Sequence, residues 1–206
     1  MKEKNKEQNF ERELPASYKQ VYRLNAKDAK TGIIINVIAF VVWVFVMILA
    51  VAARWICPPD SFFVDYDNFI ITSVVFIAVL LAYMILHELV HGIAYKGYTG
   101  EKLTFGISWS CAFCGVPNIY TYRKTALVAV AAPLVVFALI LIPATVILYF
   151  IDPIYYLLSA CLFGLHLGGC SGDIYVMYIF LFKIKDKKAL MKDTGPDMTV
   201  YTPQND

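Results

Sequence analysis

Charge is scarce over long stretches of this sequence. Only 17% of the 206 residues are charged, whereas 59% are hydrophobic, and the mean hydropathy is +0.61. The charged residues gather at the two ends and in two short connections, so the net charge of +2 does not indicate a nucleic-acid partner. This composition excludes an ordinary soluble domain and indicates an integral membrane protein, whose first partner is the lipid bilayer.

Four uncharged or nearly uncharged runs are long enough to cross a bilayer, which takes about 20 residues per helix. They predict spans at 31–53, 68–95, 125–150 and 154–182. A cleavable signal peptide is not expected, because a mixed-charge stretch of 30 residues precedes a first run that is too long for a signal core. Because the sequence shows no internal repeat and no segment large enough for a soluble domain, we predict an all-α fold of four transmembrane helices.

Lysine and arginine are distributed unevenly between the connections. The N-terminal tail has eight, the 54–67 connection one, the 96–124 connection four, the turn near Asp152 none and the C-terminal tail five. Cytoplasmic segments carry the excess of these residues in membrane proteins. We therefore expect both termini and the middle connection to face the cytoplasm.

The tails are expected to differ from each other in structure. In the tail formed by residues 1–30, apolar side chains recur at helical intervals among basic residues over 15–29, which predicts an interfacial helix on the cytoplasmic leaflet. Residues 31–182 would form the membrane domain. The polar C-terminal segment, 183–206, contains proline and glycine and is expected to be mobile.

The connection at 101–123 has a different periodicity. Apolar residues alternate with small polar ones in "KLTFGISWSC", turn residues follow, and "IYTYR" alternates again. A period of two is typical of strands, so we predict a β-hairpin between the second and third spans. It could be a structural plug or a strand edge that pairs with an extended peptide, and the sequence does not decide between them.

The cysteines give little evidence of a functional site. The five cysteines are an odd number, and Cys111 and Cys114 form a single CxxC on the expected cytoplasmic side, where thiols stay reduced. Because the second CxxC of a zinc ribbon is missing, we interpret this pair as incidental packing rather than a metal or redox site.

Histidine is scarcer still, and two of the three histidines fall in one motif. His87, Glu88 and His91 form HExxH near the end of the second span. Residues i and i+4 share one face of a helix, so both imidazoles can bind one zinc ion while the glutamate acts as general base. Two packing histidines are the alternative, but ionisable residues inside a span are rare and usually functional. We predict a metal site with Glu88 as the catalytic residue.

A catalytic zinc ion takes three protein ligands and keeps one open position. The fourth span offers His166 and Asp173 as third ligand. His91 and His87 lie five and nine residues from Lys96, Asp173 lies ten from Lys183, and His166 lies seventeen from it. In a regular helix His166 would be about 10 Å deeper. Asp173 is therefore favoured, and His166 is kept as an alternative ligand or a residue outside the ligand set, unless the glycines at 168, 169 and 172 loosen the helix.

These features resemble a known group of proteins. "HELVHG" in a membrane helix, a hairpin, "AAP" at 131–133 and an intramembrane aspartate are similar to site-2-protease-type intramembrane metalloproteases. The chain resembles still more the small four-span bacterial family of zincin peptidases, with "SGD" at 171–173 matching its late aspartate segment. The site-2 proteases carry an LDG motif that is absent here. The resemblance implies a zinc metalloprotease in a bacterial plasma membrane.

The function favoured is thus a zinc-dependent membrane-embedded peptidase that hydrolyses membrane-associated or transmembrane substrates near the cytoplasmic face, with His87, His91 and Asp173 as ligands. The alternative is a non-catalytic zinc-binding scaffold or regulator in which His166 fills the fourth position. Haem ligation is disfavoured because the two histidines share one helix. Transport is disfavoured because no inverted repeat is present. The sequence does not indicate an oligomeric state.

Overall fold

The structure is a computed structural model, and it describes residues 9–58, 69–109 and 111–204. The first residues of the N-terminal tail, most of the first connection and residue 68 of the predicted second span lie outside the described residues. Contacts between Cα atoms divide the chain into two compact units. Unit 1 contains residues 1–32, 88–132 and 173–206, and unit 2 contains 33–87 and 133–172.

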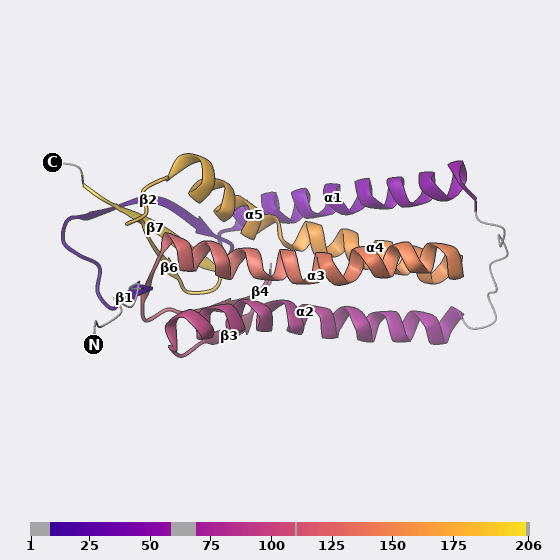
Figure 1. The fold of residues 1–206 in the computed structure, drawn as a ribbon, viewed down its shortest axis with the longest axis horizontal. Coiled ribbons are helices and arrows are strands. Elements are labelled where there is room, and N and C mark those ends of the chain that lie inside the picture. Colours follow the sequence, from indigo (N-terminus) through magenta and orange to yellow (C-terminus); the bar gives the residue numbers. More distant parts are fainter. Residues whose placement is uncertain (1–8, 59–68, 110, 205–206) are drawn as a thin grey trace, which may run out of the picture. The chain divides into compact units, whose positions relative to one another are not determined.

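Long apolar helices account for most of unit 2 (Figure 1). Their bounds are Ala29–Ile56 (α1), Phe69–Thr99 (α2), Arg123–Ile151 (α3) and Pro153–Gly169 (α4), so the N-terminal ends of α1 and α3 and the C-terminal end of α2 belong to unit 1. In the described part of the chain, α1, α2 and α3 are each long and apolar enough to cross a membrane. These helices agree with the first three predicted spans.

The fourth predicted span is broken rather than regular. After α4, the chain continues as α5 (Ser171–Tyr178) and the short π-helix η1 (Ile179–Lys183), and the two parts are bent by 42°. Counted as one span, the pair gives a fourth crossing. The break falls among the glycines of the sequence, and α5 starts two residues before Asp173.

Helix α4 is fixed at its first turn and through a close approach to α1. The Asp152 carboxylate accepts hydrogen bonds from the backbone of Ile154 and Tyr155, which caps the helix N-terminus. A Cβ atom at Gly168 would lie 2.6 Å from Ala39 O, so only glycine permits this separation of the two backbones. At Gly169, by contrast, a Cβ atom would meet nothing within 4 Å.

Unit 1 holds a five-stranded antiparallel sheet, so the fold is not all-α (Figure 1). The strand order is β1-β5-β6-β7-β2. The bounds are Phe10–Glu11 (β1), Tyr18–Asn25 (β2), Tyr120–Tyr122 (β5), Leu190–Asp193 (β6) and Asp197–Pro203 (β7). The fold is therefore mostly helical with a small sheet.

Two predictions for the tails are wrong. The expected interfacial helix at 15–29 is strand β2, and the expected mobile tail contains β6 and β7. Strand β2 pairs with β7 from Tyr18↔Pro203 to Asn25↔Asp197, with a bulge between Gln20 and Tyr22. Backbone hydrogen bonds between segments almost the whole chain apart outweigh the local helical pattern.

The predicted hairpin exists, but its second strand is different. Strand β3 (Thr104–Ile107) pairs with β4 (Ala112–Gly115), which contains the "AFCG" that was expected to form the turn. The "IYTYR" segment supplies β5, which pairs with β1 and β6 instead. The hairpin is thus shorter than 101–123.

The unit 1 core lies where helix ends meet the sheet. Among its fully buried members are Tyr95 of α2, Val130 of α3, Phe180 of η1 and Met191 of β6. Arg123 donates side-chain hydrogen bonds to Phe180 O and Ile184 O, which satisfies carbonyl groups at the end of η1. The start of α3 and the end of the broken helix are therefore held together.

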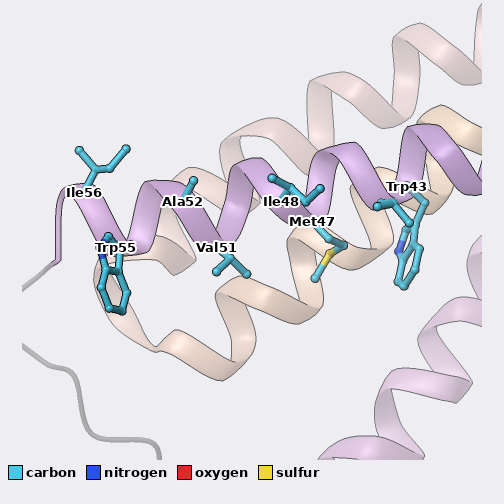
Figure 2. Close-up of a pocket in the computed structure, with 8 residues that line it drawn as sticks. Trp43, Met47, Ile48, Val51, Ala52, Trp55 and Ile56 are labelled. Atoms are coloured by element: carbon cyan, nitrogen blue, oxygen red, sulfur yellow. The ribbon is translucent and has the colours of Figure 1, made fainter.

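Unit 2 also carries an apolar groove of about 640 Å³ along α1 (Figure 2). Figure 2 shows Trp43, Met47, Val51 and Trp55 at successive turns of this helix. Side chains of this composition are suited to contact with lipid chains. The groove contains none of the predicted site residues.

Candidate metal centre

Helix α2 carries the whole HExxH motif in one uninterrupted helix. Glu88 and His91 belong to unit 1, and His87 is the last residue of unit 2 on this helix. The helix itself fixes His87 one turn before His91, on the same face. Both histidines are 7% exposed, so neither imidazole is a solvated surface group.

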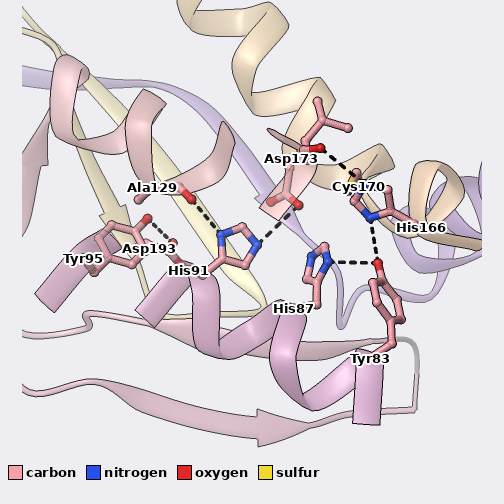
Figure 3. A network of polar contacts seen from close by, with 10 residues as sticks. Tyr83, His87, His91, Tyr95, Ala129, His166, Cys170, Asp173 and Asp193 are labelled. Carbon is pink, nitrogen blue, oxygen red and sulfur yellow. Dashed lines mark hydrogen bonds and ion pairs between the residues drawn. The ribbon is translucent and has the colours of Figure 1, made fainter. Parts of the chain in front are cut away.

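His91 lies beside Asp173 in unit 1 (Figure 3). The distance from His91 Nε2 to Asp173 Oδ2 is 3.4 Å, and both side chains are 9% exposed. His91 Nδ1 is 2.9 Å from Ala129 O. A carbonyl oxygen only accepts, so Nδ1 donates its proton there, and Nε2 is the nitrogen that faces Asp173 and could bind a metal ion in the neutral ring.

This distance is long for a charge-assisted hydrogen bond, and it also fits two ligand atoms that share one metal ion. A charge-assisted N–H···O bond is about 2.7–2.9 Å long. Two ligand atoms bound to one zinc ion at about 2.1 Å in a tetrahedral arrangement lie about 3.4 Å apart. His91 and Asp173, both in unit 1, are buried members of a group that could hold a metal ion. Imidazole and carboxylate donors fit zinc.

Glu88 is half-buried and lies four residues before Gly92, on the side of α2 that faces the hairpin. A Cβ atom at Gly92 would approach side-chain atoms of Phe105 and Leu103 within 3.0 Å, so the hairpin packs on the helix just after HExxH. Burial, followed by the charges of Asp193 and Glu88, raises the pKa of the Cys114 thiol to about 12. Cys114 is thus a neutral buried thiol, which suits packing rather than redox chemistry.

In unit 2, His87 has polar neighbours of its own (Figure 3). The Tyr83 hydroxyl lies 3.1 Å from His87 Nδ1 and 2.9 Å from His166 Nδ1. The rings of His87 and His166 have centroids 6.2 Å apart. His166 is completely buried, and the helix that contains it ends three residues later, at the break before α5.

A further possible ligand group lies entirely within unit 2. It consists of His87, His166 and Cys170, whose ligand atoms all lie within 4.8 Å of one another. Cys170 Sγ is 3.7 Å from His166 Nδ1. His87 thus has candidate metal-binding neighbours in addition to His91.

Beyond His91, the same face of α2 reaches the sheet. Tyr95 donates a hydrogen bond of 2.5 Å to Asp193 Oδ2, and the Gly195 amide donates one of 2.8 Å to Oδ1. Burial raises the pKa of the Asp193 carboxyl to about 6, although these two hydrogen bonds act in the opposite direction. This contact ties the HExxH helix to strand β6.

Sequence reasoning missed Tyr83, Cys170 and the Tyr95–Asp193 pair. Tyr83 and Tyr95 could have been found, because they lie four residues before His87 and four after His91, on the face that carries the motif. Asp193 gave no such signal, since it lies in a segment without apolar periodicity.

Helices long and apolar enough to cross a membrane, one of which carries HExxH with a buried carboxylate beside His91, define a class of helical proteins with a zincin-type motif. The sequence model of the family described as "Putative zincin peptidase" matches residues 80–188, which is more than half of the chain. The chain belongs to this family. No curated protein and no solved structure matches it.

Proposed function

We propose that the protein is a zinc-dependent membrane-embedded metallopeptidase in which His87, His91 and Asp173 hold the metal ion. The observation that carries this proposal is the 3.4 Å separation of His91 Nε2 and Asp173 Oδ2, two buried groups whose spacing suits a common zinc ion. Membership of a family of zincin peptidases supports it.

Zinc bound by these residues would polarise a scissile carbonyl and lower the pKa of a bound water toward about 7. The chain supplies the proton transfers. Glu88 would accept a proton from the attacking water and then deliver it to the departing amine nitrogen, as general base and general acid. His91, held by Ala129 O, keeps its orientation throughout.

The hairpin supports a peptide as the substrate. Strands β3 and β4 form a two-stranded sheet, so each can pair on its outer edge with an extended chain. Phe105, Ile107 and Trp109, at 50%, 83% and 64% exposed, provide apolar surface for a substrate segment that leaves the membrane. We propose transmembrane or membrane-associated proteins, unwound near the site, as substrates.

Strand pairing supports the proposed orientation. The N-terminal tail, the 96–124 connection and the C-terminal tail all contribute strands to one sheet, so they must lie on one side of any membrane that the helices cross. These are the segments that carry most of the lysine and arginine. We therefore propose that both termini and the site lie at the cytoplasmic face of a bacterial plasma membrane.

Metal removal tests the proposed activity. Purified protein in detergent is stripped with a chelator and assayed with fluorogenic peptides and a reconstituted membrane-anchored substrate. We expect cleavage by the purified protein, loss of at least about 90% of it on stripping, and recovery when one equivalent of zinc is returned. Cleavage that is unaffected by chelation would contradict the proposal.

The second candidate is a non-catalytic zinc-binding scaffold. The observation in its favour is that His166 lies in a possible ligand group with His87. His166 could then fill the coordination position of the zinc ion that a catalytic site keeps open for water. A site closed by four protein ligands would leave no place for water. Zinc binding without cleavage of any substrate would support this function.

A further inference from the structure

In unit 2, a series of hydrogen bonds runs from a backbone carbonyl oxygen through His166 and Tyr83 to His87. Because the carbonyl can only accept, it fixes the donor and the acceptor of each hydrogen bond in the series. His166 Nε2 lies 3.4 Å from Leu134 O. Because the carbonyl oxygen can only accept, Nε2 carries the proton and donates it. In a neutral imidazole the other nitrogen is then an acceptor, so His166 Nδ1 holds a lone pair.

The Tyr83 hydroxyl in turn determines which nitrogen of His87 carries the proton. Its hydroxyl is 2.9 Å from His166 Nδ1 and must donate to it. The same oxygen is 3.1 Å from His87 Nδ1, and with its own proton already directed to His166 it can only accept from that nitrogen. His87 Nδ1 is therefore protonated, and the lone pair lies on Nε2.

We propose that Tyr83 and His166 are positioning residues that fix His87 as the Nδ1–H tautomer and so prepare its Nε2 to bind zinc. The inference rests on the proposed zinc site. It assigns to His87 the arrangement that Ala129 O gives to His91, in which Nδ1 donates a hydrogen bond and Nε2 faces the ligand position. His166 then acts through Tyr83 and is not itself a ligand.

The hydrogen bond from Tyr83 to His166 favours His166 as a positioning residue over His166 as a ligand in a second metal site with His87 and Cys170. A metal ion on His166 Nδ1 would take the lone pair that Tyr83 occupies at 2.9 Å. Cys170 Sγ, at 3.7 Å from the same nitrogen, is placed as a weak donor to it. A thiol that donates to Nδ1 is compatible with the same tautomer of His166.

Zinc affinity of purified protein, measured by competition with a chromophoric chelator, tests the inference. Loss of such a partner outside the ligand set typically weakens metal binding 10–100-fold. We expect a loss of this size in Tyr83→Phe and in His166→Leu. His166→Asn keeps an acceptor for the Tyr83 hydroxyl and should restore affinity to within about threefold of the wild type. Tyr156→Phe is the matched control, because Tyr156 is a buried tyrosine that donates to Ala50 O in the same unit.

A second readout does not depend on zinc. Only three histidines are present, so ¹⁵N-histidine spectra of the metal-free protein can report each tautomer. We expect Nδ1-protonated His87 in the wild type and a gain of the Nε2-protonated form in Tyr83→Phe. An unchanged tautomer and affinity in Tyr83→Phe would overturn the inference, as would a second zinc equivalent that Cys170→Ser removes. Wild type that binds no zinc but shows the expected tautomer would instead count against the zinc site.

Discussion

Glu88→Gln is expected to lower peptide cleavage by about 10²–10⁴-fold while the protein keeps its zinc. This is the range that a positioned general acid–base typically contributes. Glutamine has nearly the same shape as glutamate but cannot accept a proton from water, so the change removes proton transfer and leaves the proposed ligands His87, His91 and Asp173 in place. Initial rates on a fluorogenic peptide, together with zinc content, measure both effects.

The matched control for this variant is Glu101→Gln. Glu101 is the only other glutamate after residue 13, and it forms a surface ion pair with Arg12 at 2.7 Å. Exposed pairs of this kind contribute at most about 1 kcal/mol, so the control should cleave at the wild-type rate. Equal cleavage by wild type and Glu88→Gln would show that the activity does not come from this site.

Asp173→Asn is expected to lower zinc affinity by at least about 100-fold. Loss of a partner outside the ligand set already costs 10–100-fold, and this change replaces an anionic ligand itself. The buried Asp173 carboxylate is also the group that His91 Nε2 faces at 3.4 Å. Chelator competition at fixed pH gives the affinity, and metal analysis after desalting gives the stoichiometry.

Asp197→Asn provides the control for this second variant. Asp197 forms an ion pair with Arg23 at the sheet surface and belongs to unit 1, as Asp173 does. Its variant should bind zinc as tightly as the wild type. If Asp173→Asn retained full affinity while His166→Asn lost zinc altogether, the third ligand would be His166.

The helices could be predicted because their signal is local. A run of about 20 apolar residues without charge has few alternatives to a membrane helix. HExxH could be predicted for a similar reason, since two histidines at i and i+4 meet on one helix face. Asp173 was singled out by its depth relative to His91, and the structure brings these two residues together.

The sheet could not be predicted because its pairings connect distant segments. Strand β2 pairs with β7, some 175 residues later, and a bulge interrupts the alternation that would have marked β2 as a strand. The break in the fourth span could not be predicted with certainty for a different reason. The glycines at 168, 169 and 172 permit a loosened helix without requiring one, and the chain bends by 42° between α4 and α5.

X-ray absorption at the zinc edge of the wild-type protein, loaded with one equivalent of zinc, tests the central claim most directly. The account predicts a first shell of nitrogen and oxygen at about 2.0–2.1 Å, with scattering from two imidazoles and no sulfur. A zinc–sulfur distance of about 2.3 Å would place the metal at Cys170 instead. A third imidazole would make His166 a ligand. Either result would contradict a site formed by His87, His91 and Asp173 with one position open.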